Sequence, residues 1–144
     1  GVGRSRWVVT ARGALVGPRC VRRVAAGTRG AGLELARCAR FGGDEFVILM
    51  PEASQAEAAA VAERVRLTVA AIDLKTPDGA EVTATVSIGV ALFPAHGRTP
   101  SDMLAAADRA VYQAKALGRN RVCAFVAQQG ENVRPMRAST RRPA

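Results

Sequence analysis

Histidine and cysteine are scarce in this 144-residue sequence, and their scarcity argues against several kinds of site. His96 is the single histidine, which disfavours a histidine-based metal site or a Ser-His-Asp triad, and we expect it to be a solvated loop residue before Gly97. The three cysteines are scattered and lack CxxC spacing, which disfavours a metal cluster or a disulfide framework: Cys20, Cys38 and Cys123. We therefore expect a reduced, cytoplasmic protein.

Long hydrophobic runs are also missing. No apolar stretch approaches the roughly 18 residues that span a membrane, and nothing after Gly1 resembles a secretory signal. A first residue other than Met suggests a processed or truncated end. With a mass of 15.1 kDa, 49% hydrophobic and 23% charged residues, the chain fits one soluble domain with a real core.

Acidic residues are absent from residues 3–32, so the net charge of +9 is unevenly spread. Residues 1–40 hold nine Arg against Glu34, and the segment 131–144 holds four Arg against Glu131. Residues 41–130 hold eight basic and ten acidic residues, and are slightly acidic. Because the basic charge lies at the two ends, without an aromatic-rich basic face, we do not expect a nucleic-acid partner.

The segment Gly42–Phe46 is the first candidate site. Two glycines let the backbone turn sharply or approach a ligand closely, and Asp44 and Glu45 follow at once. The apolar run after them predicts a buried strand that Pro51 ends. A hairpin turn with solvated acids and a metal-binding turn are about equally supported by this pattern alone. Adjacent carboxylates would suit Mg²⁺ together with a phosphate substrate.

The rest of the pattern predicts helices packed against a sheet, an α+β layer architecture. Ser54 and Glu57 form a capping box for one helix, and Thr99 with Pro100 starts another. Gly89 predicts a bulge or a close backbone approach. The expected elements are short strands at Trp7–Val9 and Ala14–Val16, strand Phe46–Met50, a helix ending near Ile72, strands Glu81–Ser87 and Ile88–Pro94, a helix capped by Gly118, and strand Arg121–Val126.

Lys115 and Arg119 lie four residues apart at the end of the last expected helix. Cations there are favoured by the helix macrodipole without any ligand, and two cations on one face can equally hold a triphosphate. The helix-terminus explanation is the stronger one from this pattern alone. Asp108, in the same helix, is either a solvated acid or a group that orients a neighbouring strand, and we assign it no role.

Three sequence blocks together resemble the GGDEF domains of bacterial diguanylate cyclases. Arg40–Phe46 resembles the motif that names the family, Thr85–Ala91 its "T-x-S-x-G-V-A" strand, and Ala107–Asn120 its closing "A-D-x-A-x-Y-x-A-K-x-x-G-R-N" helix. The resemblance covers about residues 33–126. It implies an incomplete α+β fold similar to the palm of nucleotide cyclases and polymerases, with a central mixed, largely antiparallel sheet flanked by helices.

The resemblance implies a signalling transferase that joins two GTP molecules into cyclic di-GMP with release of two pyrophosphates. Each GTP would be held by one subunit of an antiparallel homodimer, with Mg²⁺ or Mn²⁺ as cofactor. Asp44 would be the metal ligand and the acid closest to proton transfer, and Glu45 would support it as the second catalytic acid. The remaining residues would bind the GTP phosphates, through backbone or side chain: Gly42, Gly43, Lys115 and Arg119.

The departures from the family pattern lie before the turn. The "D-x-D-x-F-K-x-x-N-D" stretch, which ends a strand with the first metal-binding Asp, has no match in residues 1–32. Leu33 and Ala36 replace the inhibitory "R-x-x-D" site, so no inhibitory product site is expected. Divergence and out-of-frame translation are both open explanations for this segment. We divide the chain into an atypical segment 1–32, a GGDEF-like domain 33–128 and a basic flexible tail 129–144.

These departures predict an impaired cyclase. A two-metal site that lacks one carboxylate should lose on the order of 10²–10³ in rate or more. The alternative is a catalytically degenerate module that binds GTP or a protein partner.

Overall fold

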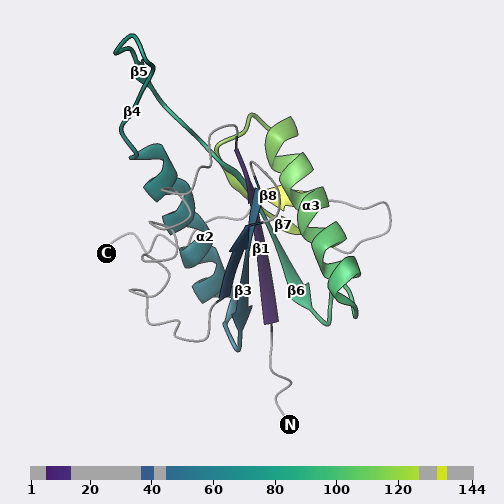
Figure 1. The fold of residues 1–144 in the computed structure, drawn as a ribbon. Coiled ribbons are helices and arrows are strands. Elements are labelled where there is room, and N and C mark those ends of the chain that lie inside the picture. Colours follow the sequence, from purple (N-terminus) through teal and green to yellow (C-terminus); the bar gives the residue numbers. More distant parts are fainter. Residues whose placement is uncertain (1–5, 14–36, 41–44, 127–132, 136–144) are drawn as a thin grey trace, which may run out of the picture.

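One mixed sheet lies between two helices in the computed structural model, which describes residues 6–13, 37–40, 45–126 and 133–135 (Figure 1). The six strands of the sheet follow the spatial order β2-β3-β1-β6-β7-β8. Their bounds are β1 Arg6–Arg12, β2 Arg37–Arg40, β3 Glu45–Pro51, β6 Ser87–Phe93, β7 Val122–Phe125 and β8 Val133–Pro135. This arrangement confirms the predicted α+β class with a central mixed sheet and the palm-like fold.

Strand β1 lies inside this sheet, between β3 and β6, although it comes from the segment of the sequence that has no acidic residues. All seven of its residues pair antiparallel with β3 on one side and with β6 on the other. Strand β6 pairs in parallel with β7, and the other neighbouring strands are antiparallel. The strand predicted at Trp7–Val9 is therefore confirmed and is longer than expected, whereas Ala14–Val16 lies outside the described residues.

Local capping signals start both helices where the sequence predicts. Helix α2, Gln55–Ala70, follows Ser54, whose side chain accepts a hydrogen bond from the Glu57 backbone N–H while the Glu57 side chain bonds back. Helix α3, Pro100–Ala116, follows Thr99, whose Oγ1 accepts from the Asp102 N–H at 3.1 Å. Each cap stabilises its helix by about 1 kcal/mol.

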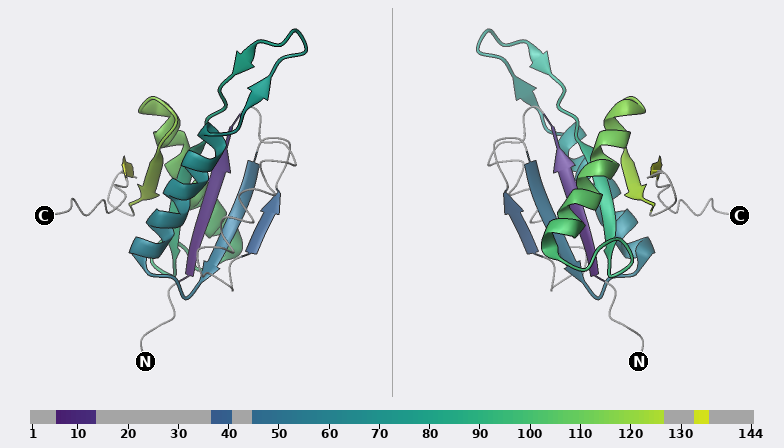
Figure 2. Two further views of the ribbon diagram at one scale, coloured as in Figure 1. Left: turned by 90° about the vertical axis from the view of Figure 1, so that its left-hand side faces the viewer. Right: turned by 90° about the vertical axis from the view of Figure 1, so that its right-hand side faces the viewer.

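The two helices cover opposite faces of the sheet (Figures 1 and 2). Because side chains alternate along a strand, Trp7 and Val9 of β1 pack in the cluster that contains α2, and Val8 packs in the cluster that contains α3. The same alternation sends Arg12, at the end of β1, to the α3 face. Glu45 reaches this face from the first position of β3 and contacts Arg12 there.

Gly89 of β6 lets α3 lie directly on the sheet. A Cβ atom at this position would lie 2.1 Å from the Ala107 carbonyl oxygen and 2.6 Å from the Val111 backbone nitrogen. No side chain fits there without moving the helix. The close backbone approach predicted at Gly89 is therefore confirmed.

The prediction of one strand over Glu81–Ser87 is wrong. Of the expected strand Glu81–Ser87, only Glu81–Val82 forms β5, which pairs with β4 (Leu74–Lys75) in a hairpin that extends away from the sheet (Figure 2). Most of the remaining residues of this alternating segment have no partner strand to pair with in the described part of the chain. In the expected flexible tail, Val133–Pro135 forms β8 and pairs with β7. None of the helices described is long and apolar enough to cross a membrane.

Candidate functional site at the end of β1

Arg12 and Glu45 lie directly opposite each other across β1 and β3, and Arg12 also pairs with Ser87 of β6. The antiparallel register therefore brings the last residue of β1 and the first residue of β3 to one point. Above this point lies Asp108 of helix α3. Glu45 and Asp108, which follow Arg12 by 33 and 96 positions in the sequence, thus meet it at one end of the sheet.

The Arg12 guanidinium bridges the two carboxylates. Its Nη2 lies 2.9 Å from Glu45 Oε2, as a hydrogen-bonded ion pair, and 3.4 Å from Asp108 Oδ1. The Glu45 side chain is 18% exposed, while Arg12 and Asp108 are 35% and 40% exposed. Asp108 Oδ1 is shielded from solvent yet makes no hydrogen bond in the described part of the chain. The single positive charge of Arg12 is therefore shared between two carboxylates, and the shielded oxygen of Asp108 has no hydrogen bond among the described residues.

The pKa of Glu45 is raised above its ordinary value by this environment. Burial is the largest cause, and the nearby Asp108 carboxylate adds to it, while the Arg12 charge and its hydrogen bond act in the opposite direction. The guanidinium thus only partly compensates Glu45 for lost water and for its negative neighbour.

A divalent cation does not fit these three side chains as they stand. Mg²⁺ prefers carboxylate oxygens that are not already held by a cation, and a guanidinium beside them would repel it. Within the described ranges, no three His, Cys, Asp or Glu side chains gather closely enough to hold a metal ion. The predicted ligand Asp44 lies outside the described residues, as do Gly42 and Gly43. Strands β2 and β3, which flank them in the sequence, are antiparallel neighbours.

The two predicted phosphate-binding cations lie at the far end of α3. Lys115 belongs to its last turn and is partly buried. Arg119 is exposed and has a positive φ of 63°, in the loop between α3 and β7. The replaced inhibitory positions, Leu33 and Ala36, lie outside the described residues.

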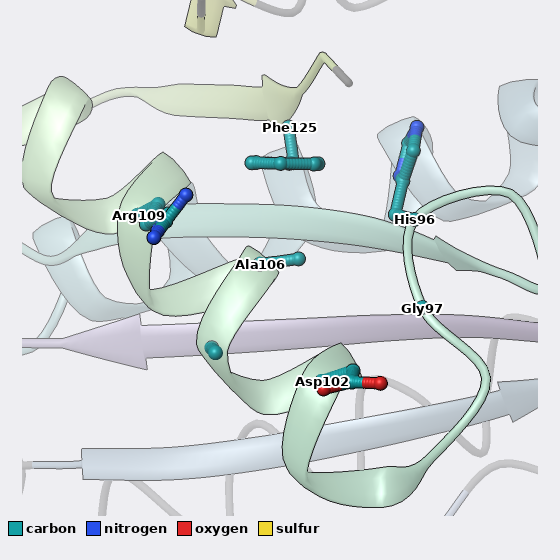
Figure 3. Close-up of a pocket in the computed structure, with 7 residues that line it drawn as sticks. His96, Gly97, Asp102, Ala106, Arg109 and Phe125 are labelled. Carbon is teal, nitrogen blue, oxygen red and sulfur yellow. The ribbon is translucent and has the colours of Figure 1, made fainter. Parts of the chain in front are cut away.

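The predicted environment of His96 is wrong. Its ring is partly buried, its Nδ1 accepts a hydrogen bond from the Leu92 N–H at 2.8 Å, and it packs edge-on against Phe125. Burial lowers the pKa of this imidazole. Figure 3 shows both rings beside a pocket of about 280 Å³, which Arg109 and Asp102 of α3 also line. Nothing in the sequence pattern singled out this packing, because it joins a loop to a distant strand.

Asp108 and Arg12 are the residues that sequence reasoning missed. Arg12 stood in a segment with no other recognisable feature, and Asp108 was left without a role. No signal in the sequence pointed to their contact, because the expected strand ended at Val9 and the contact depends on sheet register and on the packing of α3.

Comparison with known proteins assigns the chain to a family. The family model "Diguanylate cyclase, GGDEF domain" matches residues 9–121, and so begins within β1, well before residue 33 where the resemblance was first apparent. The match and the strand both extend into segment 1–32, whose origin stays a hypothesis.

Individual relatives agree with the family match. The chain is 45% identical over 84 residues to the response regulator PleD of Caulobacter vibrioides and 43% identical over 83 residues to the diguanylate cyclase DosC of Escherichia coli. Each alignment covers 58% of this chain but only 18% of the relative's length. The crystal structure of the GGDEF domain of YfiN from Pseudomonas aeruginosa is similar with a TM-score of 0.70 and 28% identity, over 87% of this chain and 84% of that one. The chain belongs to the GGDEF-domain family of diguanylate cyclases.

Proposed function

We propose that this chain is a diguanylate cyclase-type signalling domain that binds GTP but is impaired in condensing two GTP molecules into cyclic di-GMP and two pyrophosphates. The family match and the relative named as a diguanylate cyclase support the reaction class. Because the chain spans less than a fifth of the two relatives' lengths, their whole activities are not transferred to it.

The ion pair between Arg12 and Glu45 is the observation that carries the impairment. The resemblance leads us to expect a metal-binding Asp at the end of a strand upstream of the GGDEF turn. Strand β1 is present, but it ends in Thr10, Ala11 and Arg12. The Arg12 guanidinium instead forms an ion pair with the Glu45 carboxylate, at a distance of 2.9 Å. A site that carries a fixed positive charge in place of a carboxylate should lose on the order of 10²–10³ in rate or more.

In this proposal the GGDEF turn and the end of α3 keep their substrate contacts. Gly42 and Gly43 let the phosphates approach the backbone, and Lys115 and Arg119 contact them. Asp44 is the proposed ligand for Mg²⁺ or Mn²⁺, but its described neighbour Glu45 is already paired with Arg12. Each GTP would be held by one subunit of an antiparallel pair.

The same ion pair favours one alternative, a catalytically degenerate module that binds GTP or a protein partner without turnover. The two proposals agree on GTP binding and differ in whether any product forms.

Equilibrium binding of GTP to the purified chain tests what the proposal requires first. We expect saturable binding that weakens about tenfold or more when Lys115 and Arg119 are both changed to Ala, since two phosphate contacts are lost. The control is Arg98→Ala, which removes a positive charge from an exposed loop outside the site. Absence of saturable binding, or equal loss in the control, would refute GTP binding at this site.

A further inference from the structure

The loop that presents Arg119 has an unusual backbone. Three consecutive residues after α3 have positive φ angles: Gly118 at 122°, Arg119 at 63° and Asn120 at 48°. Glycine adopts this region freely and asparagine tolerates it, but an arginine there costs free energy. Such conformations persist only where surrounding contacts hold them, and they gather at functional sites.

Two local hydrogen bonds hold the backbone of Arg119. Its N–H donates to the Ala114 carbonyl at 2.9 Å, and its carbonyl accepts from Arg121 Nε at 3.1 Å. The next residue, Asn120, is held from a different element. Its Oδ1 accepts a hydrogen bond from Nη1 of Arg66, at 3.1 Å, across 54 residues of sequence. This bond ties the loop to helix α2.

Arg66 is itself fixed before it reaches the loop. Its Nε lies 3.1 Å and 3.0 Å from the two carboxylate oxygens of Glu63, one helical turn earlier, and its Nη2 also pairs with that carboxylate. The side chains of Arg66 and Glu63 are only 21% and 27% exposed. A guanidinium held in this fork presents Nη1 in one direction, so little freedom is lost when it binds Asn120.

We propose that Arg66 is a positioning residue for GTP. Held by Glu63, it fixes Asn120 and thereby the left-handed backbone from which Arg119 extends toward the phosphates. Arg66 acts through the loop and need not contact GTP. This inference rests on the proposed function, because it assumes that Arg119 binds GTP.

A double-mutant cycle on the full chain tests the proposal, with the dissociation constant for GTP as the readout. Arg66→Ala should weaken GTP binding about three- to tenfold in the parent chain and should have no further effect in an Arg119→Ala background. Asn120→Ala removes the acceptor while leaving the Arg66–Glu63 pair intact, and should weaken binding as much as Arg66→Ala. Arg64→Ala, on the exposed side of the same helix, is the charge-matched control and should change binding less than twofold.

The outcomes separate the two levels of the proposal. If the parent chain does not bind GTP, the proposed function fails and the positioning role fails with it. If GTP binds but Arg66→Ala weakens it equally with and without Arg119, the effect is electrostatic and the positioning role alone is overturned. Circular dichroism identifies a variant that does not fold. Asn120→Ala, which leaves helix α2 unchanged, then decides the question alone.

Discussion

Arg12 and Glu45 face each other across the paired strands β1 and β3, with Arg12 Nη2 only 2.9 Å from Glu45 Oε2. Strand β1 thus ends in an arginine, whereas the family resemblance leads us to expect a metal-binding aspartate at the end of a strand upstream of the GGDEF turn. Asp108 of α3, 3.4 Å from the same nitrogen, completes a cluster of two carboxylates around one guanidinium. The cluster connects β1, β3 and α3, and its three charged side chains lie in the site.

Removing the Arg12 charge should destabilise the chain at neutral pH. In Arg12→Met, the carboxylates of Glu45 and Asp108 face each other without a cation, which we expect to cost on the order of 1 kcal/mol because the groups are partly exposed. Adding Asp108→Asn should recover most of the loss. Urea denaturation of the parent, single and double variants measures both effects. A single variant as stable as the parent would contradict the account.

Glu45 should make stability depend on pH in a defined direction. Its folded pKa is raised, so the protonated form favours the folded state; that stability is present below the ordinary value of 4.5 and is lost as pH rises through the folded pKa. The Gln side chain of Glu45→Gln does not ionise, so the variant does not lose this stability as pH rises. The variant should therefore gain stability relative to the parent between pH 4 and pH 7, by less than about 1 kcal/mol.

Glu81→Gln, on the exposed first residue of β5, is the control for this series. Denaturation at several pH values measures both variants against the parent. A Glu45→Gln variant that loses stability relative to the parent as pH rises would show that the Arg12 pair outweighs burial and Asp108.

Gly89 should tolerate no side chain. Gly89→Ala places a Cβ atom 2.1 Å from the Ala107 carbonyl, so α3 must shift, and we expect a loss of about 1–3 kcal/mol or more. The control is Gly79→Ala, where nothing lies within 4 Å and only the positive φ of 88° is strained. Its loss should be the smaller of the two in denaturant unfolding. An equal or smaller loss at Gly89 would refute the close packing of β6 against α3.

How far the sequence predicts this molecule depends on how local each signal is. The capping signals at Ser54 and Thr99 each depend on only three neighbouring residues, and both helices begin where expected. Gly89 likewise indicated close packing. Strand β1 carried a weaker signal, because its identity depends on the two partners that pair with it. The alternation of Glu81–Ser87 misled, since most of that segment has no partner strand in the described chain.

The site was less predictable than the fold. Glu45 was found from the motif, but its pairing with Arg12 follows from sheet register and its contact with Asp108 from the packing of α3. Neither can be read from spacing along the chain. Asp44, Gly42 and Gly43 lie outside the described residues, and their roles stay predictions.

His96 should destabilise the chain when it is protonated. Burial lowers its folded pKa below the ordinary value of 6.5, so stability is fully present above pH 6.5 and is lost as pH falls through the folded pKa. Protonation also places a proton on Nδ1, which now accepts from the Leu92 N–H. His96→Asn keeps an acceptor but does not titrate. The melting temperature of the parent should fall from about pH 7 to pH 5 more steeply than that of the variant, and parallel curves would contradict this.

Formation of cyclic di-GMP tests the central claim most directly. The purified chain is incubated with GTP and Mg²⁺, and the product is quantified by mass spectrometry beside an Asp44→Ala control. Because Arg12 holds Glu45 and strand β1 carries no carboxylate, we predict that the parent chain forms no more product than the control. Cyclic di-GMP that accumulates with the parent chain and disappears in Asp44→Ala would contradict the account.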